Sequence, residues 1–265
     1  MNKLVNIRDI TIGDGNPIVL IGGPCAIESA EMAFATAEFL KRVTTKLGIP
    51  FVFKASFDKA NRMSIGSKRG IGLSEGLEVL YRIREELDLP IITDVHESCQ
   101  TEKVAHVVDA LQIPSFLSRQ TDLLLSAAET GKPVNIKKGQ FLKPDDMQYL
   151  AQKVHSTGNN NVLFTERGTS FGYGDIILDP RSIIEMKSSG YPVVLDVTHT
   201  TQKPGANAGT TGGNREYTPY FVKLGVALGV DAIYMEIHPD PNNAISDKEC
   251  QIPLDNAENI LKLIV

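Results

Sequence analysis

The chain has 265 residues, of which 42% are apolar and 22% charged, an ordinary composition for a globular protein that can bury a core. Its formal net charge of −5 argues against a general binder of nucleic acids or of membrane surfaces, and we expect neither a transmembrane segment nor a signal peptide. Three well-separated cysteines do not suggest a disulfide framework, so we expect a reducing, cytoplasmic setting.

Short apolar segments recur along the whole chain and predict parallel strands that are buried on both faces. They cover residues 18–23, 51–55, 90–95, 110–114, 133–138, 161–167, 192–199 and 232–238. The end of the first segment and the residues after it read "IGGPCAIES" (21–29), which places a cysteine between a predicted strand and the following helix.

Helical spacing fills the gaps between these segments. It covers residues 32–47, 77–87, 123–129, 180–190 and 254–265. Gly48 is expected to stop the first helix, Thr121 to cap the third, and Asp179 to cap the fourth, with Pro180 in its first turn and Gly190 at its end.

Alternation of eight strands with helices predicts a closed (β/α)8 TIM barrel, an α/β fold, as a single catalytic domain over residues 1–265. An open doubly wound sheet is the alternative, but no glycine fingerprint follows the first strand in the register that opens a helix. Residues 1–16 are expected to form an N-terminal hairpin, with its turn near Asp14-Gly15, that closes the bottom of the barrel.

Cations gather where the strands end, which is where a barrel carries its active site. They are Lys54, Lys59, Arg62, Lys137, Lys138 and Arg167. Each one alone could pair with a neighbouring carboxylate on the surface. Six like charges at one mouth predict an anionic guest, a phosphate or a carboxylate. The glycine-rich segment 203–213 that follows the seventh strand is either a simple loop or a lid over this mouth.

A metal site is expected at the same rim, because closing the barrel makes the last strand a neighbour of the first. Cys25, His199, Glu236 and Asp247 would then converge, although each residue taken alone has an ordinary structural explanation. Strand parity leaves open whether Glu236 or His238 supplies the ligand. A thiolate, an imidazole and carboxylates suit zinc or ferrous iron, with manganese, cobalt or cadmium as alternatives.

Eight ordered segments resemble the 3-deoxy-D-manno-octulosonate 8-phosphate synthase family over nearly the whole chain. They are "GPCAIES", "FKASFDKANR", "TDVHES", "QIPSFLSRQTDLL", "NIKKGQFL", "TERGTSFGYG", "DVTHTTQKPG" and "MEIHPDPNNAISD". The resemblance implies a (β/α)8 barrel enzyme that condenses phosphoenolpyruvate with D-arabinose 5-phosphate and water, releasing phosphate, in lipopolysaccharide biosynthesis.

Residue roles also follow from this resemblance. It implies that phosphoenolpyruvate is bound by Lys54, Lys59, Lys137, Gln140, Arg167 and the backbone of Ser115. It assigns Asn61 and Arg62 to the sugar phosphate, Asp94 and His96 to the neighbourhood of the reacting carbons, and Arg119 to a neighbouring subunit's site in a homotetramer. Cys25 stands where the metal-independent branch carries asparagine, so the chain resembles the metal-dependent branch.

Three other functions compete with this interpretation. A related synthase uses erythrose 4-phosphate, but carries a "KPRTS"-like segment where this chain has "KANR". An aldolase could instead form a Schiff base through Lys137. A barrel that senses sugar phosphates without catalysis is the third alternative.

Overall fold

The computed structural model describes residues 3–207 and 210–265, and its central feature is a closed barrel of parallel strands. The barrel strands are β3 (Val19–Gly23), β4 (Phe51–Lys54), β5 (Ile91–Asp94), β6 (Ala110–Ile113), β7 (Val134–Lys137), β8 (Val162–Glu166), β11 (Val193–Asp196) and β14 (Ala232–His238). Each pairs with its neighbour in chain order, and pairing of β14 with both β3 and β11 closes the ring. All eight predicted strands and the barrel itself are confirmed.

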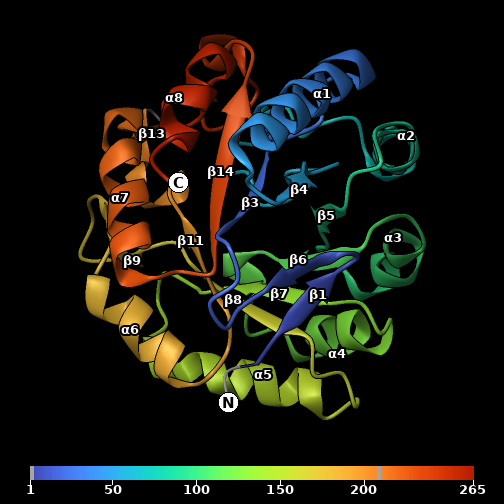
Figure 1. The fold of residues 1–265 in the computed structure, drawn as a ribbon, viewed down its shortest axis with the longest axis vertical. Helices are drawn as coiled ribbons and strands as arrows, with labels where there is room; N and C mark the ends of the chain where they lie inside the picture. Colours follow the sequence, from blue (N-terminus) through green and yellow to red (C-terminus); the bar gives the residue numbers. More distant parts are fainter. Residues whose placement is uncertain (1–2, 208–209) are drawn as a thin grey trace.

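Helices surround the barrel (Figure 1). They are α1 (Ala30–Leu47), α2 (Leu73–Leu87), α3 (Thr101–Val107), α4 (Thr121–Glu129), α5 (Met147–His155), α6 (Pro180–Ser188), α7 (Thr218–Leu228) and α8 (Ala257–Leu261). Gly48 ends α1 in the left-handed conformation, and the Asp179 side chain caps α6, both as predicted. Gln120 rather than Thr121 occupies the cap position of α4, and α8 is shorter than its apolar spacing predicted.

Alternation along the strands separates two apolar regions. Outward side chains pack under the helices, while inward side chains near the strand starts form a second core with the N-terminal hairpin. That hairpin pairs β1 (Val5–Ile7) with β2 (Ile10–Ile12) and buries Val5, Ile7 and Ile12 completely. It therefore closes the end of the barrel opposite to the carboxyl ends of the strands.

The turn of this hairpin differs from the prediction. It lies at Arg8-Asp9, with Arg8 at a φ of 52°, whereas Asp14-Gly15 follows the second strand. Asp14 and Gly15 also have positive φ, so the turn chemistry was recognised correctly but assigned to the wrong bend.

Short strands shape the loops around the barrel. They are β9 (Thr169–Ser170), β10 (Ile176–Ile177), β12 (Gln202–Asn207), β13 (Thr210–Gly213) and β15 (Ile252–Pro253). β12 and β13 make an antiparallel pair from most of the glycine-rich segment, whose residues 208–209 lie outside the described part of the chain. Within the described residues, no helix has the length and apolar character needed to cross a membrane.

Candidate active site

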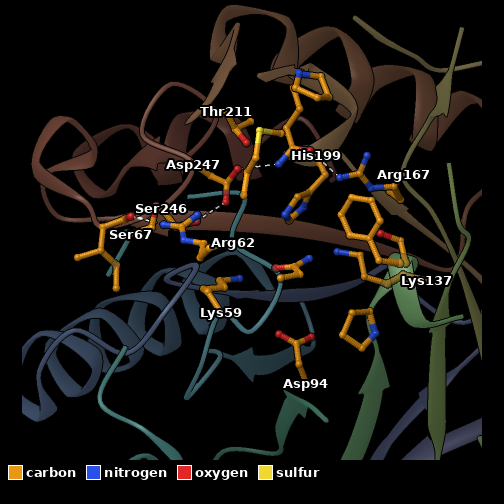
Figure 2. Close-up of a pocket in the computed structure, with 18 of the residues that line it drawn as sticks. Lys59, Arg62, Ser67, Asp94, Lys137, Arg167, His199, Thr211, Ser246 and Asp247 are labelled. Carbon is orange, nitrogen blue, oxygen red and sulfur yellow. Dashed lines mark hydrogen bonds between the residues drawn. The ribbon is translucent and has the colours of Figure 1, made fainter. Parts of the chain in front are cut away.

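A cavity of about 570 Å³ opens at the carboxyl ends of the barrel strands (Figure 2). Predicted site residues along its wall are Lys54, Lys59, Asn61, Arg62, Asp94, His96, Ser115, Lys137, Gln140, Arg167, His199 and Asp247. These residues follow seven of the eight barrel strands, so the closed sheet is what brings them together.

The cavity floor carries a buried cation–carboxylate cluster. Lys54 Nζ lies 3.1 Å from Asp94 Oδ2 and donates to Ser56 Oγ at 2.6 Å, and Ser56 in turn donates to Asp94. Burial alone would raise the pKa of Asp94, but Lys54 and Lys59 hold it well below its usual range. Asp94 is therefore an ionised acceptor, while burial lowers the pKa of the neighbouring His96 and favours the neutral imidazole.

A second cluster joins β7, β11 and β14. Lys137 pairs with Asp196 and lies 3.8 Å from the centre of the Tyr234 ring. Asp196 also contacts Nδ1 of His199 at 2.7 Å, which fixes the orientation of the imidazole. Although burial acts to raise the pKa of Asp196, His199 and Lys137 lower it, so this carboxyl is an anion that serves two partners.

Arg167 lines this cavity and is a buried cation with donors that lack acceptors in the described part of the chain. It is 3% exposed, its Nη2 donates to Gln202 at 2.6 Å, and neither Nε nor Nη1 has a partner among the described residues. Burial lowers the pKa of this guanidinium. Donors desolvated in this way and left without acceptors are typical of a site that binds an anionic ligand.

Lys138 faces away from the cavity, contrary to the sequence-based expectation. Its Nζ lies 3.5 Å from Glu166 Oε1 and donates to backbone carbonyls in the loops after β7 and β8. The reason is strand alternation, which sends adjacent Lys137 and Lys138 to opposite faces of the sheet. Through these hydrogen bonds, Lys138 connects the loop that carries Gln140 to the loop that carries Arg167.

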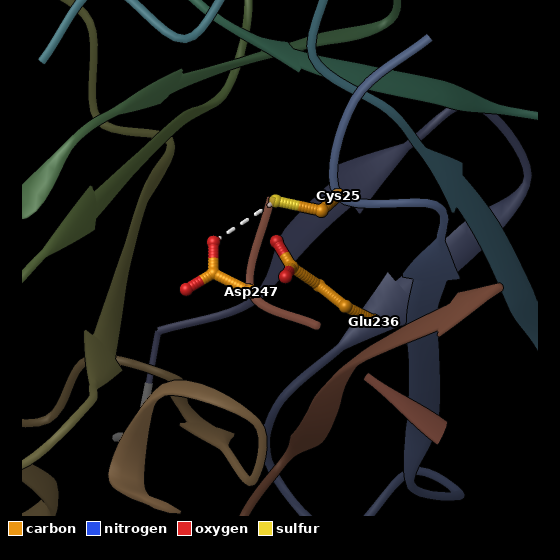
Figure 3. Close-up of side chains that lie close together, drawn as sticks. All are labelled: Cys25, Glu236 and Asp247. Carbon is orange, nitrogen blue, oxygen red and sulfur yellow. Dashed lines mark hydrogen bonds between the residues drawn. The ribbon is translucent and has the colours of Figure 1, made fainter. Parts of the chain in front are cut away.

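Three of the predicted metal ligands meet beside the cavity (Figure 3). Single ligand atoms of Cys25, Glu236 and Asp247 all lie within 4.8 Å of one another, and Cys25 Sγ is 3.2 Å from Asp247 Oδ2. His199 is outside this trio, but its Nε2 lies 3.7 Å from Glu236 Oε1. Glu236 Oε2 is buried without a hydrogen-bond partner in the described structure.

Charge around these residues fits a cation. Burial and the Glu236 carboxylate raise the pKa of the Cys25 thiol well above its usual range. Thiolate, carboxylate and imidazole donors together suit a divalent transition metal. Such a metal would compensate the negative charge of the buried carboxylates and would give Glu236 Oε2 a partner. Glu236 rather than His238 belongs to this group, because His238 Nε2 instead contacts Glu28 at 3.1 Å.

Arg62 lies at the outer end of the cavity. Its Nη1 donates to Ser246 Oγ at 2.8 Å, and its Nη2 donates to the carbonyl of Ile245. Arg62 therefore links the loop after β4 to the loop that presents Asp247. Arg119 is exposed and lies outside the set of described residues that line the cavity of its own chain.

Several cavity residues were missed by the sequence interpretation. Tyr234, Gln112 and Gln202 line the cavity, and the Tyr234 hydroxyl lies 3.0 Å from Glu236 Oε1. Period-two alternation could have identified Tyr234, which precedes Glu236 by two residues on the same strand. Gln202 follows the end of β11 and has no comparable signal.

Comparison with known proteins gives consistent results. The chain matches the DAHP synthetase I family over residues 2–265. Among curated proteins, it is 49% identical to a 2-dehydro-3-deoxyphosphooctonate aldolase from Cyanothece sp., over 100% of this chain and 97% of that protein. Proteins with the same name from Rickettsia canadensis and Fusobacterium nucleatum are 51% and 50% identical, over 98% and 100% of this chain and 95% of each relative.

Proposed function

The chain belongs to the DAHP synthetase I family, and from that premise we propose that it condenses phosphoenolpyruvate with D-arabinose 5-phosphate and water. The products are 3-deoxy-D-manno-octulosonate 8-phosphate, a precursor of lipopolysaccharide, and inorganic phosphate. The observation that carries this proposal is the buried Arg167 guanidinium, which lines a cavity together with further cations and has two donors without partners among the described residues. Two phosphorylated substrates are the natural guests of such a cavity.

Phosphoenolpyruvate occupies the inner part of the cavity in this proposal. Arg167 and Lys137 bind its anionic groups, with Gln140 and the backbone of Ser115 beside them. Lys54 lies 3.1 Å from Asp94 and Lys59 lies 3.8 Å from Glu236, and both lysines line the same cavity. Holding both substrates in one orientation contributes strongly to catalysis, because their translational and rotational entropy is lost on binding and not in the chemical step.

Arabinose 5-phosphate lies toward the opening, where Asn61 and Arg62 take its phosphate. Its aldehyde then faces C3 of phosphoenolpyruvate near Asp94 and His96. C3 attacks the aldehyde carbon to form the new carbon–carbon bond, and water adds at C2. Cleavage of the carbon–oxygen bond at C2 then releases phosphate.

We further propose a resident divalent metal, zinc or ferrous iron, held by Cys25, His199, Glu236 and Asp247. Support comes from the close approach of three of these ligands and from the His199 imidazole, whose Nδ1 is held by Asp196. When bound, such a metal would supply a Lewis acid that could orient the aldehyde or lower the pKa of bound water.

Assembly and location are part of the same proposal. We expect a cytoplasmic homotetramer in which Arg119, exposed in the single chain, reaches the cavity of a neighbouring subunit. Because the Lys137 amine pairs with Asp196, it is not free to attack a carbonyl, which argues against a Schiff-base aldolase.

Choice of sugar is the sharpest test of the proposed function. Purified protein should be supplied with phosphoenolpyruvate and either arabinose 5-phosphate or erythrose 4-phosphate, and the products identified by mass. We expect the eight-carbon product and turnover that strongly favours arabinose 5-phosphate. Preference for erythrose 4-phosphate, or an adduct trapped by borohydride, would overturn the assignment.

A further inference from the structure

Beneath the cavity, three buried polar side chains lead across neighbouring strands to Asp94. Thr165 on β8 donates its hydroxyl to Asn135 Oδ1 at 2.7 Å, and Asn135 Nδ2 donates to Gln112 Oε1 at 3.0 Å. Gln112 Nε2 then donates to Asp94 Oδ1. We call Thr165, Asn135 and Gln112 the amide relay.

The direction of every bond in the relay follows from its end at Asp94. An ionised carboxylate only accepts hydrogen bonds, so Gln112 must present its amino group and turn its carbonyl toward Asn135. Asn135 must then present its own amino group, which leaves Oδ1 for the Thr165 hydroxyl. A hydroxyl can donate or accept, so Asp94 sets this direction, and the Thr165 hydroxyl supplies the donor that Asn135 Oδ1 then requires.

Burial argues against a purely packing role for these residues. Thr165 and Asn135 are fully buried, and Gln112 is 1% exposed. Interior layers of such barrels are normally filled by valine, isoleucine and leucine, and burying an amide costs free energy unless it is hydrogen-bonded. The layer nearer the hairpin in this same barrel is indeed apolar, with Ile92 and Leu163 on the strands that carry Asp94 and Thr165.

We propose that Thr165, Asn135 and Gln112 are positioning residues that hold the Asp94 carboxylate in one orientation at the cavity floor. This inference rests on the proposed function, in which Asp94 lies near the reacting carbons. Ser56 supplies the second donor to Asp94 from the opposite side, so the relay completes a clamp on both carboxylate oxygens. Asp94 points from this clamp toward the cavity (Figure 2).

Matched variants of Thr165 test the relay. Thr165→Val removes the hydroxyl at nearly constant volume, whereas Thr165→Ser keeps it. Asn135→Asp reverses the relay, because the new carboxylate cannot donate and obliges Gln112 to turn its carbonyl toward Asp94. The charged and titratable neighbours of Asp94, which are Lys54, Lys59, His96 and Tyr234, stay unchanged in all three variants.

The readout is the separate effect on kcat and on the KM of each substrate at neutral pH, where Asp94 is ionised. Loss of the oriented donor should lower kcat by roughly tenfold for Asn135→Asp and by less for Thr165→Val, with both KM values close to those of the wild type. Thr165→Ser should follow the wild type. Melting temperatures separate this effect from loss of fold, and the Thr165 pair keeps the test valid if Asn135→Asp is unstable.

Equal kcat values for Thr165→Val and Thr165→Ser, or a fall in kcat that only accompanies a fall in melting temperature, would mean a merely structural role and would overturn the proposal. Failure of the proposed function looks different, because the wild type would then not turn over the two substrates. In that case crystal structures of the wild type and of Asn135→Asp would still test the relay, because the Asp94 carboxylate should be turned in the variant. An unchanged carboxylate would overturn the proposal.

Discussion

Single side chains in the cavity owe their protonation states to their neighbours and to burial. Asp94 is ionised because Lys54 and Lys59 outweigh its desolvation, whereas His96, two residues further along the chain, is driven toward the neutral form by burial. At neutral pH the cavity thus places the ionised Asp94 beside the neutral imidazole of His96. These two groups can accept protons from, or hydrogen-bond to, an aldehyde and a water molecule.

The lowered pKa of His96 predicts a specific dependence of stability on pH. In the unfolded chain a histidine titrates near 6.5, so below that pH, down to the folded-state pKa, the unfolded state binds more protons. Stability from His96 is therefore present above about pH 6.5 and is lost as pH falls through this window, by at most about 1.4 kcal/mol per pH unit.

Urea unfolding of the wild type and of His96→Gln measures this contribution. The free energy of unfolding should fall less in the variant than in the wild type between about pH 7 and about pH 5.5. His106→Gln, a change at an exposed histidine, serves as the control and should follow the wild type. Parallel curves for His96→Gln and wild type would contradict the prediction.

Cys25 is the residue on which the proposed metal site depends most. Cys25→Ala removes the thiolate and should weaken binding of a divalent metal by at least about tenfold, with loss of synthase activity. Metal content after dialysis and the thiolate absorption band of cobalt-loaded protein both report this independently of turnover. The exposed Cys99→Ala should keep metal and activity, and a Cys25→Ala protein that keeps both would remove the metal from the account.

Individual residues could be placed from the sequence because a barrel gathers its strand ends at one face. Cys25 and Lys137 were placed at this rim on that ground, whereas strand parity left Glu236 and His238 as alternatives and the structure groups Glu236 with Cys25. Lys138 was misassigned because alternation was not applied to adjacent lysines. Asp247 lies in an irregular loop with a φ of 49°, where periodicity carries no information, so barrel closure and the family resemblance suggested this residue without fixing its geometry.

Among the elements, β3 packs tightly on β4 and so brings Cys25, a proposed metal ligand, close to the cations of the cavity wall. A Cβ built on Gly23 would lie 2.2 Å from the Lys54 carbonyl oxygen, so the two backbones approach as closely as only glycine allows. This contact sets the spacing between Cys25 and Lys54. Strand and helix existence was predictable from apolar spacing, whereas this close approach was not, because it depends on strand register.

Gly23→Ala should therefore destabilise the protein by about 1–3 kcal/mol and also reduce substrate affinity, since relief of the clash displaces β3 or β4. Chemical denaturation and calorimetric titration of phosphoenolpyruvate measure the two effects. Gly174→Ala is the matched control, because a Cβ there meets no atom within 4 Å. Equal stability of both variants would show that β3 accommodates the methyl group.

Loops after β7 and β8 are joined by the buried Lys138–Glu166 pair. Lys138→Met leaves Glu166 as an uncompensated buried charge and should cost about 3–5 kcal/mol of stability. Adding Glu166→Gln removes that charge, so the double variant should recover part of the loss. Urea unfolding of both proteins tests this, and a double variant less stable than Lys138→Met would contradict it.

For the whole molecule, one end of the barrel is sealed and the other is open. Hairpin residues fill the sealed end with apolar side chains, so stability and function are separated along the barrel axis. The closed barrel and its hairpin were predictable from eight repeated units. The turn of the hairpin was not, since Arg8 adopts a left-handed conformation that its residue type does not signal.

The variant Ile7→Ala tests whether stability at the sealed end is independent of substrate binding at the open end. Truncation of the fully buried side chain should cost about 2–5 kcal/mol of stability while leaving phosphoenolpyruvate affinity unchanged. Leu4→Ala, at a side chain that is 48% exposed, is the control and should have a small effect on stability. Weakened substrate binding in a folded Ile7→Ala protein would mean that the two ends are coupled.

In the proposed function, one open rim of the barrel holds both a metal and two phosphorylated substrates. Release of inorganic phosphate from phosphoenolpyruvate with arabinose 5-phosphate tests this arrangement when it is measured before chelation, after chelation and again after metal is restored. We expect rapid release that requires the sugar, disappears on chelation and returns with a divalent transition metal. Phosphate release that is independent of the sugar, or unchanged by complete removal of metal, would contradict it.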